Sequence, residues 1–321
     1  MGRYFKNKYL NLTKMSHIRG NCKAGLWQTV SLFCILRSQN KTISGAQKDR
    51  KSVGTGRMHM IGGNRSMALL EVTNVKKIYT TRFGGNQVQA LKNVTFSVEA
   101  GEFVAIMGES GSGKTTLLNI LASLDRPTEG EVLLEGKSIV RLTEKEISAF
   151  RRKNLGFVFQ DFNLLDTFSL RDNIYLPLVL AGEDYREMEQ KIRPIAKALR
   201  ITDILDKYPY EVSGGQKQRA AVARALITSP RLVLADEPTG ALDSRAASAL
   251  LSMFEEINRE GQTILMVTHS AQAASHASRV LFIKDGEVFH QIYRGTKTTQ
   301  EMYQMISDTL TILMTGGETY A

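Results

Sequence analysis

A glycine-rich stretch at residues 108–115 has the composition of a phosphate-binding loop. It reads Gly-Glu-Ser-Gly-Ser-Gly-Lys-Thr and directly follows an apolar, strand-like run at residues 103–107. Its glycines let the backbone turn tightly, so that N–H groups can face the β- and γ-phosphates of a nucleotide; Lys114 adds a positive charge, and Thr115 a hydroxyl for Mg²⁺. A helical pattern at 115–122 would aim a helix N-terminus at the same phosphates. The alternative to a phosphate-binding loop is a glycine- and serine-rich turn that matches the motif by chance. The expected ATP contacts are Gly108, Glu109, Ser110, Gly111, Ser112, Gly113, Lys114, Thr115 and Thr116.

Two carboxylates follow a second apolar run. Residues 231–235 read Arg-Leu-Val-Leu-Ala and lead to Asp236 and Glu237. The carboxyl ends of strands are where α/β sheets bind ligands. Asp236 suits Mg²⁺, which prefers oxygen ligands, and Glu237 could orient and deprotonate an attacking water. The alternative is a pair of acids that starts a turn before Pro238.

Two further apolar runs end in residues that could contact a phosphate. Residues 263–268 lead to His269, and residues 156–159 lead to Gln160. A single histidine is more often structural than catalytic, but two other phosphate elements already end at strand tips, which favours a catalytic role. Gln160 by itself could be a polar residue that caps a buried strand. Its functional interpretation depends on the motifs that follow it.

Residues 212–216, Val-Ser-Gly-Gly-Gln, open a strongly helical run that continues to Leu226. Ser213 is placed to cap this helix, and two glycines would let its N–H groups approach a phosphate. A generic loop before a helix explains the pattern equally well.

Tyr79 could stack on an adenine ring. A packed strand tyrosine is the alternative there, and Phe83 could take the stacking role instead.

Charge divides the chain into two parts. The whole chain carries +10, but residues 1–66 hold 13 Lys and Arg against one acid, Asp49, so residues 67–321 carry about −2. The pI near 9.5 therefore comes from the extension, and we expect no nucleic-acid partner for the rest. Both cysteines, Cys22 and Cys34, also lie in the extension. The remainder thus has no disulfide, as suits a reducing cytoplasm.

Residues 1–66 admit three interpretations. Lys23 and Arg37 flank a 13-residue, mostly apolar stretch, which could belong to a targeting segment. The extension could also be a basic disordered arm, or it could lie upstream of the true start. We favour the last, because Met67 precedes the first clear strand pattern at 68–73 and the codons of Gly62-Gly63 could form a ribosome-binding site. The expected working protein is residues 67–321, and since no run of 18 apolar residues occurs, any membrane role requires a partner.

Taken together, these motifs resemble those of the ATPase subunit of an ABC transporter. In that family they are the Walker A loop (108–115), the Q-loop (Gln160), the signature (212–216), Walker B (232–236) with the catalytic Glu237, the D-loop (241–243) and the H-loop (His269). Val212 departs conservatively from the usual leucine. The resemblance implies an α/β fold: a P-loop NTPase core with a mainly parallel sheet and flanking helices, an antiparallel β subdomain, a helical subdomain at about 161–210, and a C-terminal hairpin and helix at about 279–314.

The resemblance also implies a mechanism. Two ATPase domains form a head-to-tail homodimer, in which a signature (Ser213, Gly214, Gly215 and Gln216) closes on the γ-phosphate held by Lys114 of the other copy. Glu237, His269 and Gln160 would be catalytic, Asp243 would couple the two sites, and Thr115, Gln160 and Asp236 would hold Mg²⁺. The dimer would work on the cytoplasmic face of the plasma membrane, where residues 163–180 dock on a separate integral-membrane permease.

A narrower resemblance concerns residues 176–182, 237–244 and 285–295, with the helical pattern that follows. They are similar to exporters of macrolides, lipoproteins and antimicrobial peptides, and the tail is most like the bacitracin-type resistance and sensing ATPases of Gram-positive bacteria. This implies export or sensing of bacitracin-like peptides, with a histidine kinase as a further partner. A macrolide or lipoprotein exporter is the alternative. A soluble ABC ATPase fits less well, because the chain has one motif set and no long coiled-coil insertion.

Overall fold

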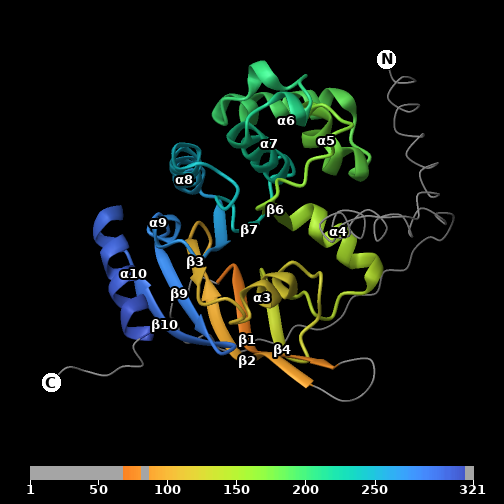
Figure 1. Ribbon diagram of the computed structural model, residues 1–321. Helices are drawn as coiled ribbons and strands as arrows, with labels where there is room; N and C mark the ends of the chain where they lie inside the picture. Colours follow the sequence, from red (N-terminus) through yellow and green to blue (C-terminus); the bar gives the residue numbers. More distant parts are fainter. Residues whose placement is uncertain (1–67, 81–86, 315–321) are drawn as a thin grey trace, which may run out of the picture. The chain divides into compact units, whose positions relative to one another are not determined.

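The computed structural model describes residues 68–80 and 87–314. The predictions about the extension, and the alternative stacking residue Phe83, fall outside this part of the chain. The described elements, labelled as in Figure 1, are β1 Leu70–Thr80, β2 Gln87–Val98, β3 Phe103–Met107, α3 Lys114–Leu121, β4 Glu129–Leu134, β5 Lys137–Ser138, α4 Glu144–Asn154, β6 Leu155–Phe159, α5 Leu170–Ala181, α6 Tyr185–Ala198, η2 Thr202–Ile204, η3 Pro209–Glu211, α7 Gly214–Leu226, β7 Leu232–Asp236, α8 Ser244–Arg259, β8 Thr263–Val267, α9 Ala271–Ala274, β9 Arg279–Lys284, β10 Glu287–Tyr293 and α10 Thr299–Met314.

A parallel sheet forms the centre of the fold, with the strand order β9-β3-β8-β7-β6. Every residue of β3 and β8 is buried, as expected of parallel strands that are covered on both faces. Alternate residues serve different faces: Phe103 and Ala105 join a core cluster with α5, α7 and α8, whereas Val104 and Ile106 join one with α3. The predicted α/β class, with its mainly parallel sheet and flanking helices, is confirmed.

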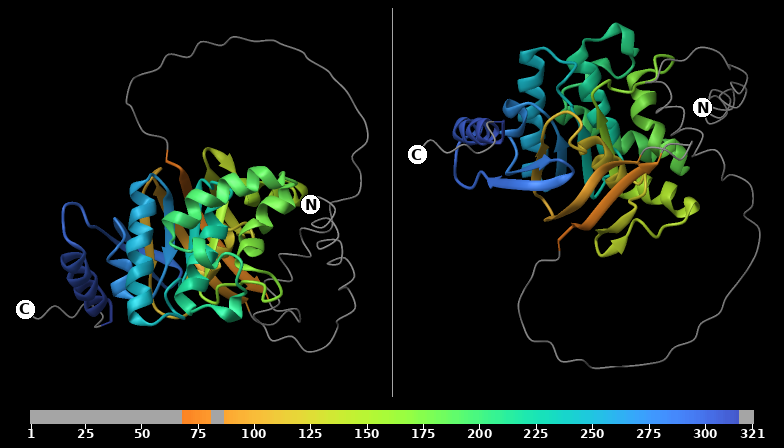
Figure 2. Two further views of the ribbon diagram at one scale, coloured as in Figure 1. Left: turned by 90° about the horizontal axis from the view of Figure 1, so that it is seen from above. Right: turned by 60° about the horizontal axis from the view of Figure 1, so that its bottom comes forward.

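An antiparallel layer of β5, β4, β1 and β2 extends the sheet on the other side of β10. It lies at the bottom of Figure 1, and in the second view of Figure 2 its strands come forward. This layer shares a core cluster with α3, in which Leu91 and Val94 pack with Leu117 and Leu121. The predicted antiparallel β subdomain is therefore present, and it covers the helix that follows the phosphate loop.

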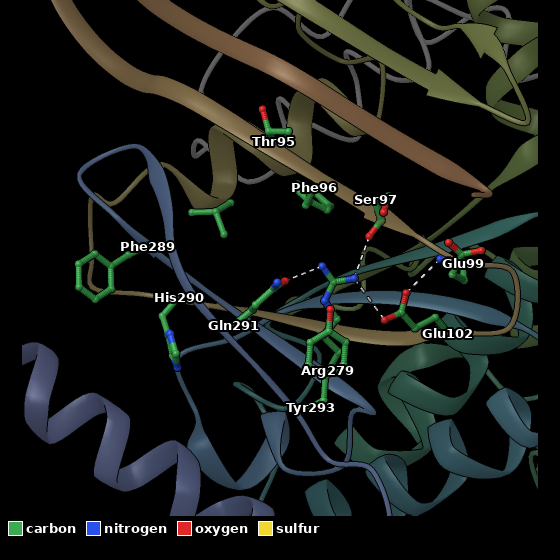
Figure 3. A pocket seen from close by; sticks show the side chains of 11 residues that line it. Thr95, Phe96, Ser97, Glu99, Glu102, Arg279, Phe289, His290, Gln291 and Tyr293 are labelled. Atoms are coloured by element: carbon green, nitrogen blue, oxygen red, sulfur yellow. Dashed lines mark hydrogen bonds and ion pairs between the residues drawn. The ribbon is translucent and has the colours of Figure 1, made fainter. Parts of the chain in front are cut away.

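The junction between the two parts of the sheet is narrow. β10 pairs with β2 at one position, Glu287 with Asn93, and beyond it a hollow of about 660 Å³ separates the strands. Figure 3 shows Arg279 spanning this hollow. Its Nη1 donates to the Ser97 carbonyl oxygen at 3.0 Å and its Nη2 to Gln291 Oε1 at 2.7 Å. The buried guanidinium of Arg279 thus links β2 and β10 at a point where these two strands are no longer paired.

The helices α5, α6 and α7 group on the side of the core away from the antiparallel strands (Figure 1). Ser169 and Asp184 cap α5 and α6, and Gly182 ends α5 in a left-handed conformation. Asn173 is fully buried and bonds the backbone of Leu165 through its side-chain oxygen and nitrogen, which fixes the segment before α5. In the described ranges, no helix combines the length and apolar character needed to cross a bilayer.

Candidate nucleotide-binding and hydrolysis site

The phosphate loop joins the end of β3 to the start of α3. Two of its glycines are required sterically, because a Cβ at Gly108 would lie 2.1 Å from the Ile283 carbonyl oxygen and one at Gly113 would lie 2.5 Å from that of Ala90. Gly113 also has a φ of 101°, which disfavours any side chain. The loop therefore passes against the main chain of its neighbours, leaving glycine as the residue that fits.

Lys114 begins α3 and folds back over the loop. Its Nζ donates to the carbonyl oxygens of Gly108 at 2.8 Å and Glu109 at 2.7 Å. Burial lowers the pKa of this ammonium, although the carboxylates of Glu237 and Asp236 oppose the change. The lysine predicted to bind phosphate thus lies within electrostatic reach of both predicted strand-tip acids.

Asp236 and Glu237 stand at the end of β7. Burial raises the pKa of Asp236, the charge of Glu237 raises it further, and Lys114 opposes the rise. Glu237 has a φ of 46°, and its N–H donates to the Val267 carbonyl oxygen at 2.9 Å. Left-handed backbone at a non-glycine residue is strained and is held by its surroundings. Here the bond to the end of β8 fixes where the Glu237 side chain begins.

The Glu237 carboxylate contacts two residues that follow β8. Its Oε1 lies 2.8 Å from His269 Nδ1, and its Oε2 accepts a hydrogen bond from Thr268 Oγ1 at 3.1 Å. The His269 side chain is 74% exposed whereas that of Glu237 is 17% exposed, so the imidazole is free to turn toward a ligand while the carboxylate stays held. Sequence reasoning missed Thr268, although its place directly before His269 at the strand end was a usable signal.

Gln160 follows β6 and lies against the segment after Glu237. A Cβ placed on Gly240 would be 2.9 Å from its Cδ and Nε2. The structure therefore brings together, around the carboxyl ends of β3, β6, β7 and β8, most of the residues predicted to act on the nucleotide: Lys114, Gln160, Asp236, Glu237 and His269.

Ser213 and the glycines after it lie elsewhere. Ser213 caps α7, since its Oγ accepts from the Gln216 N–H at 3.3 Å and the Gln216 side chain accepts from the Ser213 N–H at 2.9 Å. Gly214 and Gly215 lie beside residues 241–246, in the segment where Asp243 caps α8. Figure 1 shows α7 apart from α3. A single chain thus does not bring its signature to its own phosphate loop.

Tyr79 ends β1 and has a fixed ring. Its hydroxyl donates to Asp125 Oδ2 at 2.8 Å, and Lys77 Nζ lies 4.8 Å from the ring centre while donating to Asp125 Oδ1 at 2.6 Å. The residue is 41% exposed. The ring is therefore partly exposed and held in place. Its contacts with Lys77, two residues away, and with Asp125, 46 residues away, were not predicted.

Comparison with known proteins identifies the family. A model described as ABC transporter matches residues 91–240. The uncharacterized ABC transporter ATP-binding protein YvcR of Bacillus subtilis is 53% identical over 253 residues, which are 78% of this chain and 96% of that protein. The chain belongs to the ABC transporter ATP-binding proteins. As a member of this family it binds ATP and is an ATPase, which confirms the resemblance seen in its motifs.

Other ABC proteins extend the comparison. The bacitracin export ATP-binding protein BceA of Halalkalibacterium halodurans is 49% identical over 77% of this chain and 97% of its own length. The macrolide export protein MacB of Wolinella succinogenes is 42% identical over 70% of this chain but only 34% of its own length. The dimeric structure of the bacterial cassette MJ0796 is 39% identical, covers 70% of this chain and 98% of that one, and has a TM-score of 0.64. A post-hydrolysis form of that cassette contains ADP and Pi.

Proposed function

We propose that this chain is the ATP-hydrolysing subunit of an exporter of bacitracin-like antimicrobial peptides, and that it works as a homodimer bound to a separate membrane permease. The pairing of Glu237 with His269 is the observation that carries the hydrolytic part of this proposal. The Glu237 carboxylate is held in place, the His269 imidazole beside it is exposed, and Lys114 of the phosphate loop is near. This arrangement suits attack of water on the terminal phosphate of ATP.

Each of these residues has a distinct part in the reaction. Lys114 and the loop N–H groups hold the phosphates, and Glu237 orients the attacking water and accepts its proton. His269 turns from Glu237 to the γ-phosphate and supports the charge that develops there. Gln160, which lies against Gly240, reports the presence of the γ-phosphate to the helical segment that follows it.

The location of the signature supports a homodimer. Ser213 and its glycines cap α7 beside residues 241–246 rather than the phosphate loop of the same chain. A helix N-terminus with two glycines suits an anion, and a second copy turned head to tail can supply it. Asp243, next to the signature, would couple the two sites. The related cassette MJ0796 was solved as a dimer.

Magnesium fits the residues present. The described part of the chain holds no group of three or more His, Cys, Asp or Glu side chains arranged for a metal. Mg²⁺ usually takes one or two carboxylates together with substrate phosphates and waters, so such a group is not required. Burial raises the pKa of Asp236 at the end of β7, and a nearby cation would favour the charged form of this carboxylate. Asp236, Thr115 and Gln160 would hold the ion, which neutralises phosphate charge when bound.

The permease would bind the helical segment. Residues 163–180 begin three positions after Gln160, and Arg224 of α7 donates to the Asn163 carbonyl oxygen. A movement of this segment would therefore be felt both at Gln160 and at α7, which begins at the signature. Leu180 is 38% exposed at the end of this segment. Docking would place the dimer on the cytoplasmic face of the plasma membrane, in a Gram-positive bacterium. A histidine kinase is a further partner of the assembly.

The substrate class rests on the relatives. BceA is named for bacitracin export and aligns over almost its whole length. MacB, named for macrolide export, has about two thirds of its length outside the match, and macrolide export is the second candidate. Deletion of the gene should increase sensitivity to bacitracin, and the parental gene but not a Glu237→Gln variant should restore resistance. A change in macrolide sensitivity alone would support the second candidate instead.

A further inference from the structure

The amide of Gln218 joins two loops of the active site. This side chain is fully buried on α7, and its Nε2 donates to the Pro238 carbonyl oxygen at 2.7 Å and to the Phe159 carbonyl oxygen at 3.1 Å. Pro238 directly follows Glu237, and Phe159 directly precedes Gln160. One amide group therefore bridges the backbone beside the general base and the backbone beside the proposed phosphate sensor, next to the last paired position of β6 and β7, Phe159 with Asp236.

The remaining atom of this amide argues against a purely structural role. Gln218 Oε1 is buried and has no hydrogen-bond partner within the described part of the chain. An unsatisfied buried polar atom destabilises the fold, and each one in a native protein calls for an explanation. If packing alone were required here, an apolar side chain of the same shape would avoid this cost. The two donated bonds are the feature that the amide adds.

Arg224, farther along the same helix, holds the backbone just after Gln160. Its Nη2 donates to the Phe162 carbonyl oxygen at 2.9 Å and its Nη1 to that of Asn163 at 2.5 Å. Phe162 and Asn163 both have a positive φ, 61° and 50°, so this turn is held in a conformation that most residues avoid. Burial lowers the pKa of Arg224 to about 10. The segment from 159 to 163 is thus tied to α7 at two places.

The same helix begins at the signature. Ser213 caps its N-terminus, and Gln218 lies just over one turn into it. A hydrogen-bonded helix moves as a unit over such a short distance. A displacement of its N-terminus by a phosphate would therefore reach the backbone beside Gln160 and Glu237 through the Gln218 amide.

We propose that Gln218 is a positioning residue: it transmits engagement of the signature with the partner's nucleotide to Gln160 and Glu237 of its own chain. The inference rests on the proposed function, because it requires the head-to-tail dimer. Displacing reacting groups by about 1 Å can slow a reaction about 100-fold. Loss of the amide should therefore lower the rate of hydrolysis without weakening ATP binding.

Gln218→Met tests this, because methionine keeps the shape and removes both donors. Gln262→Met is a matched control, since Gln262 Nε2 also donates to two backbone carbonyl oxygens, of Pro230 at 3.2 Å and Thr263 at 3.1 Å, at the other end of β7 and β8. In the full-length chain, Gln218→Met should lower kcat about tenfold or more, with the Kd for ATP and the melting temperature close to those of the control. A kcat within twofold of the control would overturn the proposal.

Mixed dimers decide where the residue acts. One copy carries Glu237→Gln, so that a single site hydrolyses ATP, and Gln218→Met is placed in either copy. The rate should fall when the methionine shares a chain with the intact Glu237 and stay within about twofold when it lies in the other chain. A fall in the second placement alone, or equal falls in both, would contradict the proposed route. If Glu237→Gln copies do not dimerise with ATP at all, the proposed homodimer is wrong. The kcat of Gln218→Met against that of Gln262→Met would then still test whether Gln218 positions Glu237.

Discussion

The imidazole of His269 lies 2.8 Å from the carboxylate of Glu237, although 31 residues separate the two along the chain. The contact exists because β7 and β8 are parallel neighbours that end at the same edge of the sheet. Glu237 is fixed on both sides, by its own N–H bonded to Val267 and by the hydroxyl of Thr268. The His269 side chain is mostly exposed, and Glu237 is its hydrogen-bond partner within the described residues. The imidazole is therefore the less restrained partner of the pair.

His269→Ala should therefore leave nucleotide affinity nearly unchanged and slow hydrolysis. The carboxylate would keep its bond to Thr268, but the charge on the γ-phosphate would lose one donor, which typically costs about 100-fold or more in kcat. Steady-state ATPase assays together with equilibrium binding of ATP measure both quantities. If the affinity for ATP fell together with kcat, His269 would contribute to ATP binding in the ground state and not specifically to hydrolysis.

Thr268→Val tests the hydroxyl that sequence reasoning missed. Thr268 is fully buried, and valine has its shape without the donor. The Glu237 carboxylate should then become more mobile, with a decrease in kcat of about tenfold and little change in the Kd for ATP. Thr309→Val is a suitable control, because the hydroxyl of Thr309 on α10 donates to a helix carbonyl oxygen, that of Met305. An equal decrease in both variants would contradict a specific role for Thr268.

Gly113→Ala should abolish ATP binding. The new methyl group would lie 2.5 Å from the Ala90 carbonyl oxygen at a φ of 101°, so the loop must shift away from its phosphate-binding conformation. Gly182→Ala is the matched control: it also has a positive φ, of 81°, but open space around the new methyl. The control should cost only about 1 kcal/mol of stability and bind ATP normally, as thermal unfolding and nucleotide titration can establish.

Tyr79→Phe and Tyr79→Ala separate stacking from bracing. Phenylalanine keeps the ring but loses the bond to Asp125, so the KM for ATP should rise only about two- to threefold, whereas alanine should raise it about tenfold because stacking on a base contributes about 1–3 kcal/mol. Equal effects of the two substitutions would mean that the hydroxyl, and not the ring, is what the nucleotide requires.

Asp236→Asn should stabilise the protein in the absence of nucleotide and Mg²⁺ while it impairs hydrolysis. The folded pKa of this acid is raised above its ordinary value, mainly by burial. Its ionisation therefore destabilises the fold increasingly as the pH rises from the ordinary pKa to the raised one. At neutral pH the melting temperature should rise by about 1–3 °C. The gain should shrink as the pH falls through the raised pKa, because the parent then becomes protonated. A gain that does not change with pH would contradict this cause.

The sequence allowed the fold class and most of the site to be predicted, for a physical reason. Each motif directly follows a short apolar run, and parallel strands bring their carboxyl ends to one edge, so Lys114, Asp236, Glu237 and His269 could be placed together before any coordinates. The side-chain contacts of Thr268, Gln218 and Asp125 could not be predicted, even though the position of Thr268 at a strand end was visible in the sequence. Their partners lie 20 to 59 residues away, and local pattern carries no information on such side-chain contacts.

Glu237→Gln tests whether Glu237 activates water in a site which a second copy completes. Molar mass in solution and ATPase rate are measured on this variant with and without ATP and Mg²⁺. We expect ATP binding at parental affinity, hydrolysis reduced by about 100-fold or more, and a stable dimer that appears only with ATP. A variant that hydrolyses ATP at the parental rate, or remains a monomer when saturated with ATP, would contradict it.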